Sequence, residues 1–131
     1  MIQKVLAFET SCDDTSVSIV DQSGKVWSLV SSTKDLDHEP YGGIVPEIAS
    51  RNHSFAILPL IDEAFKKSGL SWNDVQGLVV TNRPGLIGAL IVGLVTVKSL
   101  AMSKNLPFVG VNHLEGHLLA PFLNDEEYVP V

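Results

Sequence analysis

An apolar stretch in the second half of the chain is the feature that most constrains the fold. Residues 86–104 carry no charge as far as Val97, and only Gly88, Gly93 and Thr96 interrupt the hydrophobic side chains. A bilayer span needs roughly 20 apolar residues. The uncharged part is shorter than that, so we predict a packed central helix rather than a membrane span.

Short apolar segments lie on both sides of this predicted helix. Residues 77–81 precede it and residues 107–111 follow it, and each segment has the length and composition of a buried strand. A strand, a helix and a second strand form a right-handed crossover that brings parallel strands together. Gly85, Gly88 and Gly93 would let a neighbouring backbone approach closely, but their spacing is too irregular for a dinucleotide-binding fingerprint.

Three further strands are predicted near the N-terminus. Residues 4–8 are apolar, residues 16–20 alternate polar and apolar, and residues 25–30 follow a hairpin turn at 21–24. Consecutive strands joined by tight turns are antiparallel neighbours. The polar turn 9–15 between the first two strands is therefore expected at one edge of the sheet.

This turn carries Glu9, Asp13 and Asp14. One hypothesis is that its carboxylates hold a magnesium ion or a phosphate-bearing ligand. The simpler interpretation is that carboxylates and hydroxyls often occupy turns. Cys12 has no histidine near it in the sequence and is expected to be a small loop residue rather than a nucleophile.

A long helical region is predicted between Pro46 and Gly69. Pro59 is expected to kink or divide it, and His53 is expected to be solvated or to act as a cap. Apolar residues at three- and four-residue steps predict one buried stripe, formed by Val45, Ile48, Ala49, Phe55, Leu58, Ile61 and Phe65. A second face is also apolar, at Ile44, Ile57 and Leu60, and could be covered by the sheet or by a partner helix.

His113 and His117 lie one helical turn apart, a spacing that can present two imidazoles to one divalent metal. The alternative is two histidines on a short solvated helix. Glu115 would lie roughly 200° around the helix from each histidine, which argues against a role as the base of a metallopeptidase. Asn112 and Glu115 instead have capping-box spacing. The positive end of the helix dipole disfavours a bare cation, so anionic ligands from elsewhere would be needed.

The composition restricts the function classes. A length of 131 residues fits one domain. A net charge of −6 argues against this chain binding nucleic acid by itself, because phosphate binding depends on lysine and arginine. One cysteine permits no internal disulfide, and no basic segment precedes an apolar one at the N-terminus. We therefore expect a cytoplasmic protein with no membrane attachment.

The order of the elements is three antiparallel strands followed by helix, strand, helix, strand and helix. It predicts an α/β fold with a mixed five-stranded sheet and flanking helices. This is the order found in the RNase H-like half of an actin-like ATPase (ASKHA) fold. The acidic turn and His113 should both lie at strand ends.

Four sequence blocks stand in one order that, taken together, resembles the N-terminal part of the TsaD family. These blocks are residues 9–15, 41–53, 84–90 and 113–121. The family makes the threonylcarbamoyladenosine modification of tRNA and has also been described as glycoproteases or O-sialoglycoprotein endopeptidases. The resemblance covers nearly the whole chain.

The resemblance implies a transferase that moves a threonylcarbamoyl group from threonylcarbamoyl-adenylate to the adenosine beside the tRNA anticodon. His113 and His117 match the family's metal-binding histidines, with iron or zinc as the usual metal. Asp13 and Asp14 match its catalytic acidic loop, which faces the nucleotide and any accompanying magnesium. Two residues depart from the family pattern: Asp14 replaces a glutamate, and Arg83 replaces a glycine.

The family chain also has a second domain with a glycine-rich nucleotide loop and an aspartate as third metal ligand. We expect residues 1–125 to form the N-terminal actin-like subdomain, residues 126–131 to begin the second domain, and this part alone to be inactive. The alternatives are a metal-dependent glycoprotease or a non-catalytic subunit like TsaB, whose family lacks the two histidines. The resemblance implies pairing with TsaB, with residues 44–65 as the candidate surface. Without that partner we expect a homodimer or a larger assembly that uses residues 44–65, the exposed sheet edge, or both.

Overall fold

The computed structural model describes residues 3–11, 14–32 and 46–119. These residues form a sheet with strand order β3-β2-β1-β4-β5. Its strands are β1 (Lys4–Glu9), β2 (Thr15–Asp21), β3 (Val26–Ser32), β4 (Gly77–Arg83) and β5 (Phe108–Asn112). The helices are α2 (Pro46–Ser68), α3 (Ile87–Lys104) and α4 (His113–Leu119), with a short 3-10 turn η2 (Trp72–Asp74) before β4.

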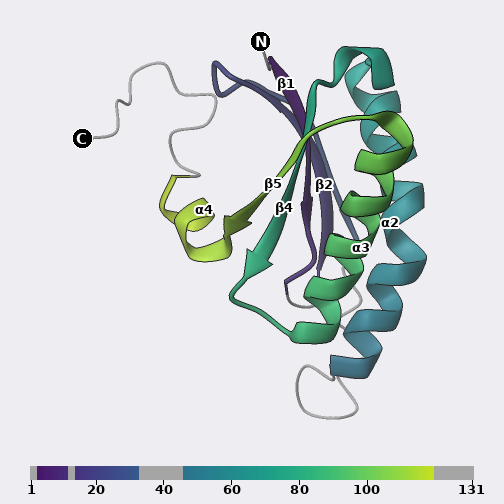
Figure 1. Cartoon of the computed structure of the whole chain (residues 1–131), viewed down its shortest axis with the longest axis vertical. Coiled ribbons are helices and arrows are strands. Elements are labelled where there is room, and N and C mark those ends of the chain that lie inside the picture. Colours follow the sequence, from purple (N-terminus) through teal and green to yellow (C-terminus); the bar gives the residue numbers. More distant parts are fainter. Residues whose placement is uncertain (1–2, 12–13, 33–45, 120–131) are drawn as a thin grey trace.

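The sheet is mixed, as the sequence predicts. β1 pairs antiparallel with β2 and β2 with β3, whereas β4 runs parallel to both β1 and β5. Helices α2 and α3 lie side by side on one face, and α4 lies on the other side of the sheet (Figure 1). The expected five-stranded α/β architecture is therefore confirmed.

The core lies between the sheet and helices α2 and α3. Alternate residues of the strands point toward these helices, because successive side chains of a strand lie on opposite faces. The buried set on the strands comprises Leu6, Phe8, Val17, Ile19, Val30, Leu78 and Val80. The same alternation puts Glu9 on the opposite face from Phe8, away from the two long helices.

Helix α2 differs from its prediction in two ways. It is one continuous helix with Pro59 inside it, so the predicted division is wrong. Its buried face includes Ile57 and Leu60, whereas Phe55 and Leu58 are 75% and 61% exposed. The helix has two apolar faces, and the sheet packs against the one that also carries the small residues Ala49 and Ala64.

His53 belongs to this buried face of α2. It is fully buried, so the expectation of a solvated or capping residue is wrong. Its Nδ1 lies 2.6 Å from Thr15 Oγ1. A sequence pattern cannot reveal this hydrogen bond, because Thr15 comes from a different strand.

Helix α3 is the one helix within the described ranges that is long and apolar enough to cross a membrane by length and composition. One side of it packs against β4 and α2 and buries residues that include Gly93 and Val97. The other side exposes Ile87, Ile91 and Val95. The predicted packing of this helix is thus confirmed for one side only.

Candidate functional site at the carboxyl ends of three strands

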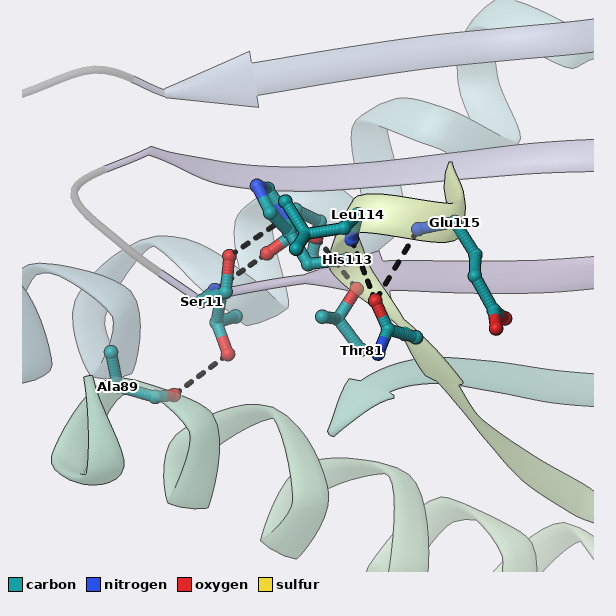
Figure 2. Close-up of polar contacts among 9 residues, drawn as sticks. Ser11, Thr81, Ala89, His113, Leu114 and Glu115 are labelled. Atoms are coloured by element: carbon teal, nitrogen blue, oxygen red, sulfur yellow. Dashed lines mark hydrogen bonds and ion pairs between the residues drawn. The ribbon is translucent and has the colours of Figure 1, made fainter. Parts of the chain in front are cut away.

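Polar residues gather where β1, β4 and β5 end. These three strands are parallel to one another, so their carboxyl ends lie at the same edge of the sheet. Glu9 ends β1, Thr81 lies near the end of β4, and His113 follows β5 directly. Figure 2 shows His113 and Thr81 at this edge, together with Ser11 from just after the end of β1. In α/β sheets, ligands bind at this edge.

Glu9 is the centre of the cluster. Its Oε2 accepts a hydrogen bond from Thr81 Oγ1 at 2.6 Å and lies 3.0 Å from His113 Nδ1. Its Oε1 accepts a hydrogen bond from the Ser11 amide at 2.6 Å. Ser11 Oγ also lies 3.1 Å from His113 Nδ1. One carboxylate therefore contacts the acidic turn (residues 9–15), β4 and the first residue of α4.

The backbone around Ser11 is held by the N-terminal end of α3. The Leu86 amide donates to the Ser11 carbonyl at 2.8 Å, and Thr10 Oγ1 donates to the Ala89 carbonyl at 2.7 Å. Gly85 lies so close to the Ser11 backbone that an added Cβ would overlap it. The predicted close approach at this glycine is confirmed, and it fixes where the acidic turn leaves β1.

His113 is the first residue of α4. Asn112 Oδ1 accepts hydrogen bonds from the Leu114 and Glu115 amides at 2.8 and 3.3 Å, which confirms Asn112 as the helix cap. The Glu115 side chain extends away from His113 and the cluster (Figure 2). This direction agrees with the interpretation that Glu115 does not serve a metal held by His113.

Two opposing effects act on the pKa of Glu9. Burial is the largest and raises the pKa, but hydrogen bonds from Ser11, Thr81 and His113 together outweigh it. The pKa of the Glu9 carboxyl is therefore below its ordinary value. Glu9 is ionised at neutral pH and offers a negative charge to the imidazole beside it.

The remaining predicted site residues are only partly described. Asp14 is exposed and directly precedes β2, whereas Asp13 and Cys12 lie outside the described residues. His117 lies in α4 one turn after His113, and its side chain is outside the described set. The residues that the structure describes contain no group of three His, Cys, Asp or Glu side chains that could hold a metal. A metal at His113 would need donors beyond them.

Arg83, which is expected from the sequence to depart from the family pattern, is the last residue of β4. Its side chain is exposed, and its peptide bond to Pro84 is cis. The side chain at this position is therefore open to solvent, and Gly85, two residues further on, lies against the Ser11 backbone.

Sequence reasoning assigned no role to Ser11 or Thr81, and it included Glu9 only among the turn carboxylates that could hold magnesium or a phosphate-bearing ligand. The signal was present: a glutamate ends an otherwise apolar strand, and a threonine ends the strand that is parallel to it. Its meaning depends on the strand order, which places β4 beside β1 and β5 beside β4. The expectation that the first turn and His113 both lie at strand ends is confirmed.

This sheet order, two helices on one face and a polar cluster at the ends of parallel strands define the RNase H-like half of an actin-like ATPase fold. "YeaZ from Pseudomonas aeruginosa" has the same fold: it superposes with a TM-score of 0.62 over 85% of this chain and 44% of its own, at 19% identity. The chain belongs to the TsaD family, since the family model described as tRNA N6-adenosine threonylcarbamoyltransferase matches residues 25–131.

Named relatives agree with this family. The tRNA N6-adenosine threonylcarbamoyltransferase of Bdellovibrio bacteriovorus is 72% identical over 130 residues, which is 99% of this chain and 38% of the relative. The enzyme of the same name from Pelobacter propionicus is 52% identical over 119 residues, or 91% of this chain and 35% of the relative. The chain thus spans little more than a third of the length of these relatives.

Proposed function

We propose that this chain supplies the N-terminal actin-like subdomain of a tRNA N6-adenosine threonylcarbamoyltransferase. The observation that carries the proposal is the 72% identity to a relative of that name over almost the whole chain. The substrates would be threonylcarbamoyl-adenylate and tRNA. Because the chain carries a net charge of −6, we expect most tRNA contacts to come from the rest of the enzyme or from its partners.

A divalent metal, iron or zinc, would be held by His113 and His117 with an aspartate from the second domain of the complete enzyme. His113 fits such a group as one ligand, and the other donors would come from outside the described side chains. The His113 side chain is 28% exposed and rests against an ionised carboxylate, an arrangement common for metal-binding imidazoles. A bound metal would supply a Lewis acid that polarises an oxygen of the substrate, while His113 and Glu9 hold the site in place. With two of three ligands, this chain alone should bind metal weakly.

Asp13 and Asp14 would face the nucleotide part of the substrate. Asp14 is exposed at the start of β2, and the two ends of its turn are fixed by Ser11 and Thr15. An exposed carboxylate next to such an anchored residue can hold a magnesium-bound phosphate or transfer a proton. Replacing Asp13 or Asp14 with asparagine should therefore reduce modification sharply without unfolding the protein.

The metallopeptidase alternative requires a base beside the metal. The placement of Glu115, whose side chain extends away from His113 (Figure 2), disfavours it. A TsaB-like non-catalytic subunit is the other alternative, but the two histidines in this chain favour the transferase.

The outer face of α2 and α3 would bind a TsaB-like partner in the cytoplasm. A hollow of about 480 Å³ lies between the two helices and is lined mainly by apolar residues, among them Leu58, Ile91 and Val95. Large exposed apolar surfaces on folded proteins usually mark contacts. Without the partner, the same face could pair two copies of the chain in a symmetric homodimer.

Reconstitution tests the proposed activity directly. The complete enzyme that contains this chain should form threonylcarbamoyladenosine when it is incubated with tRNA, threonine, bicarbonate, ATP and its partner proteins. The Asp13→Asn variant should lose most of this product, measured by mass spectrometry of digested tRNA. Cleavage of a glycoprotein with no tRNA product would instead support the peptidase.

A further inference from the structure

Glu9 occupies an unusual place for a carboxylate. It ends a strand whose other residues from Val5 to Phe8 are apolar, and its side chain is 33% exposed. Both of its oxygens are engaged: Oε1 by the Ser11 amide, and Oε2 by Thr81 Oγ1 and His113 Nδ1. A carboxylate fixed at both oxygens cannot rotate freely, so it can impose an orientation on the imidazole that contacts it.

The imidazole contact specifies which ring nitrogen carries the proton. Oε2 of ionised Glu9 is only an acceptor, and it lies 3.0 Å from His113 Nδ1. Neutral His113 therefore carries its proton on Nδ1, and Ser11 Oγ at 3.1 Å can accept from the same N–H. In this tautomer Nε2 bears the lone pair, which is the form that a metal requires on that nitrogen.

We propose that Glu9 is a positioning residue that fixes the ring orientation and tautomer of His113, so that Nε2 is the nitrogen presented to a metal. The inference rests on the proposed metal site and deepens it, because it gives a role to a residue outside the predicted ligand set. Metal-binding histidines commonly donate their second ring N–H to a carboxylate in this way, and losing that carboxylate typically costs about 10- to 100-fold in metal affinity.

Thr81 extends the same arrangement to a neighbouring strand. Its hydroxyl donates to Glu9 Oε2 at 2.6 Å, and β4 is paired with both β1 and β5. Removing that hydroxyl leaves the Glu9 charge in place but loosens the carboxylate. Thr81→Val should therefore shift the tautomer equilibrium of His113 in the same direction as Glu9→Ala does, but by a smaller amount.

The test uses ¹⁵N-labelled chain and two readouts. Ring ¹⁵N chemical shifts of His113, recorded at a pH at which the imidazole is neutral, report the tautomer in the absence of metal. In the unsubstituted chain we expect the proton on Nδ1, and in Glu9→Ala a shift toward the Nε2–H tautomer. Zinc titration followed by NMR reports affinity, which should fall about 10- to 100-fold in Glu9→Ala and less in Glu9→Gln. Glu63→Gln, which changes an exposed glutamate paired with Lys67, is the matched control and should change neither.

The two readouts separate this inference from the metal site itself. If Glu9→Ala and Thr81→Val fold and keep the original tautomer and zinc affinity, the positioning role is wrong. If the tautomer changes but zinc does not bind at His113 even in the complete enzyme, Glu9 positions the ring and the metal assignment fails. Should Glu9→Ala not fold, Glu9→Gln and Thr81→Val still decide through the same shifts.

Discussion

His53 in α2 and Thr15 at the start of β2 are joined by a buried contact, with His53 Nδ1 2.6 Å from Thr15 Oγ1. Both side chains are almost completely buried. Thr15 directly follows the turn that carries Asp13 and Asp14, and on the other side of this turn Thr10 is bonded to the Ala89 carbonyl. The acidic turn is therefore fixed at one end by α2 and at the other by α3.

Replacing Thr15 with valine should destabilise the chain. The substitution keeps the shape of the side chain but removes a hydroxyl that meets a buried imidazole, and such a loss costs about 1–3 kcal/mol. Urea denaturation should show a lower free energy of unfolding with an unchanged slope. Thr15→Ser keeps the hydroxyl and should lose less stability than the valine variant. Equal stability of the valine variant and the original chain would show that this contact contributes nothing.

Gly93→Ala should also destabilise, although alanine is the better helix former. A Cβ on Gly93 would lie 2.6 Å from Thr10 Oγ1 and 3.2 Å from Val80 Cγ2. Overpacking of this kind costs about 1–3 kcal/mol, which exceeds the gain in helix propensity of about 1 kcal/mol. Gly116→Ala is the matched control, because nothing lies within 4 Å of a Cβ there. In thermal denaturation, Gly93→Ala should have a lower melting temperature than the original chain, whereas the melting temperature of Gly116→Ala should be equal or higher.

Asp21 should make stability depend on pH in acid. Hydrogen bonds from the Ser23 and Trp27 side chains, with backbone donors, lower its pKa from 3.8 to about 2. The ionised carboxylate therefore contributes stability above about pH 4, and this contribution is lost as the pH falls toward 2. Asp21→Asn should unfold at a lower urea concentration than the original chain near pH 6. The difference between the two urea midpoints should shrink as the pH falls toward 2. A constant difference across this range would contradict the assignment.

Leu58→Glu should weaken association through the outer face of α2 and α3 and leave the fold intact. Leu58 is 61% exposed beside the hollow between the helices, so the charge does not enter the core. Sedimentation velocity over a concentration series should show more monomer. Leu29→Glu is the matched control, because Leu29 is 64% exposed but lies on β3. Dissociation by Leu29→Glu alone would place the contact on that strand instead. A chain that is monomeric at every concentration would exclude the homodimer.

Much of the fold follows from local sequence patterns. Alternation in the strands and the turn at 21–24 each depend on residues close together in the chain, and each is confirmed. Pro46 and Gly69 also predict the bounds of α2 correctly, since caps and breakers act within one helical turn.

The tertiary structure alone decides which apolar face of α2 is buried and which residues meet at the site. Ile57 and Leu60 lie in the core, whereas Phe55 and Leu58 are exposed, because the face of α2 with Ile57 and Leu60 is the one that packs against the sheet. Glu9 and His113 are 104 positions apart in the sequence. They meet because β4 inserts between β1 and β5 with all three strands parallel. The sequence by itself predicts the helices and strands and identifies His113 and His117 as candidate ligands. The order of the strands in the sheet determines what His113 contacts, because Glu9 is brought to it by strand pairing and not by spacing along the chain.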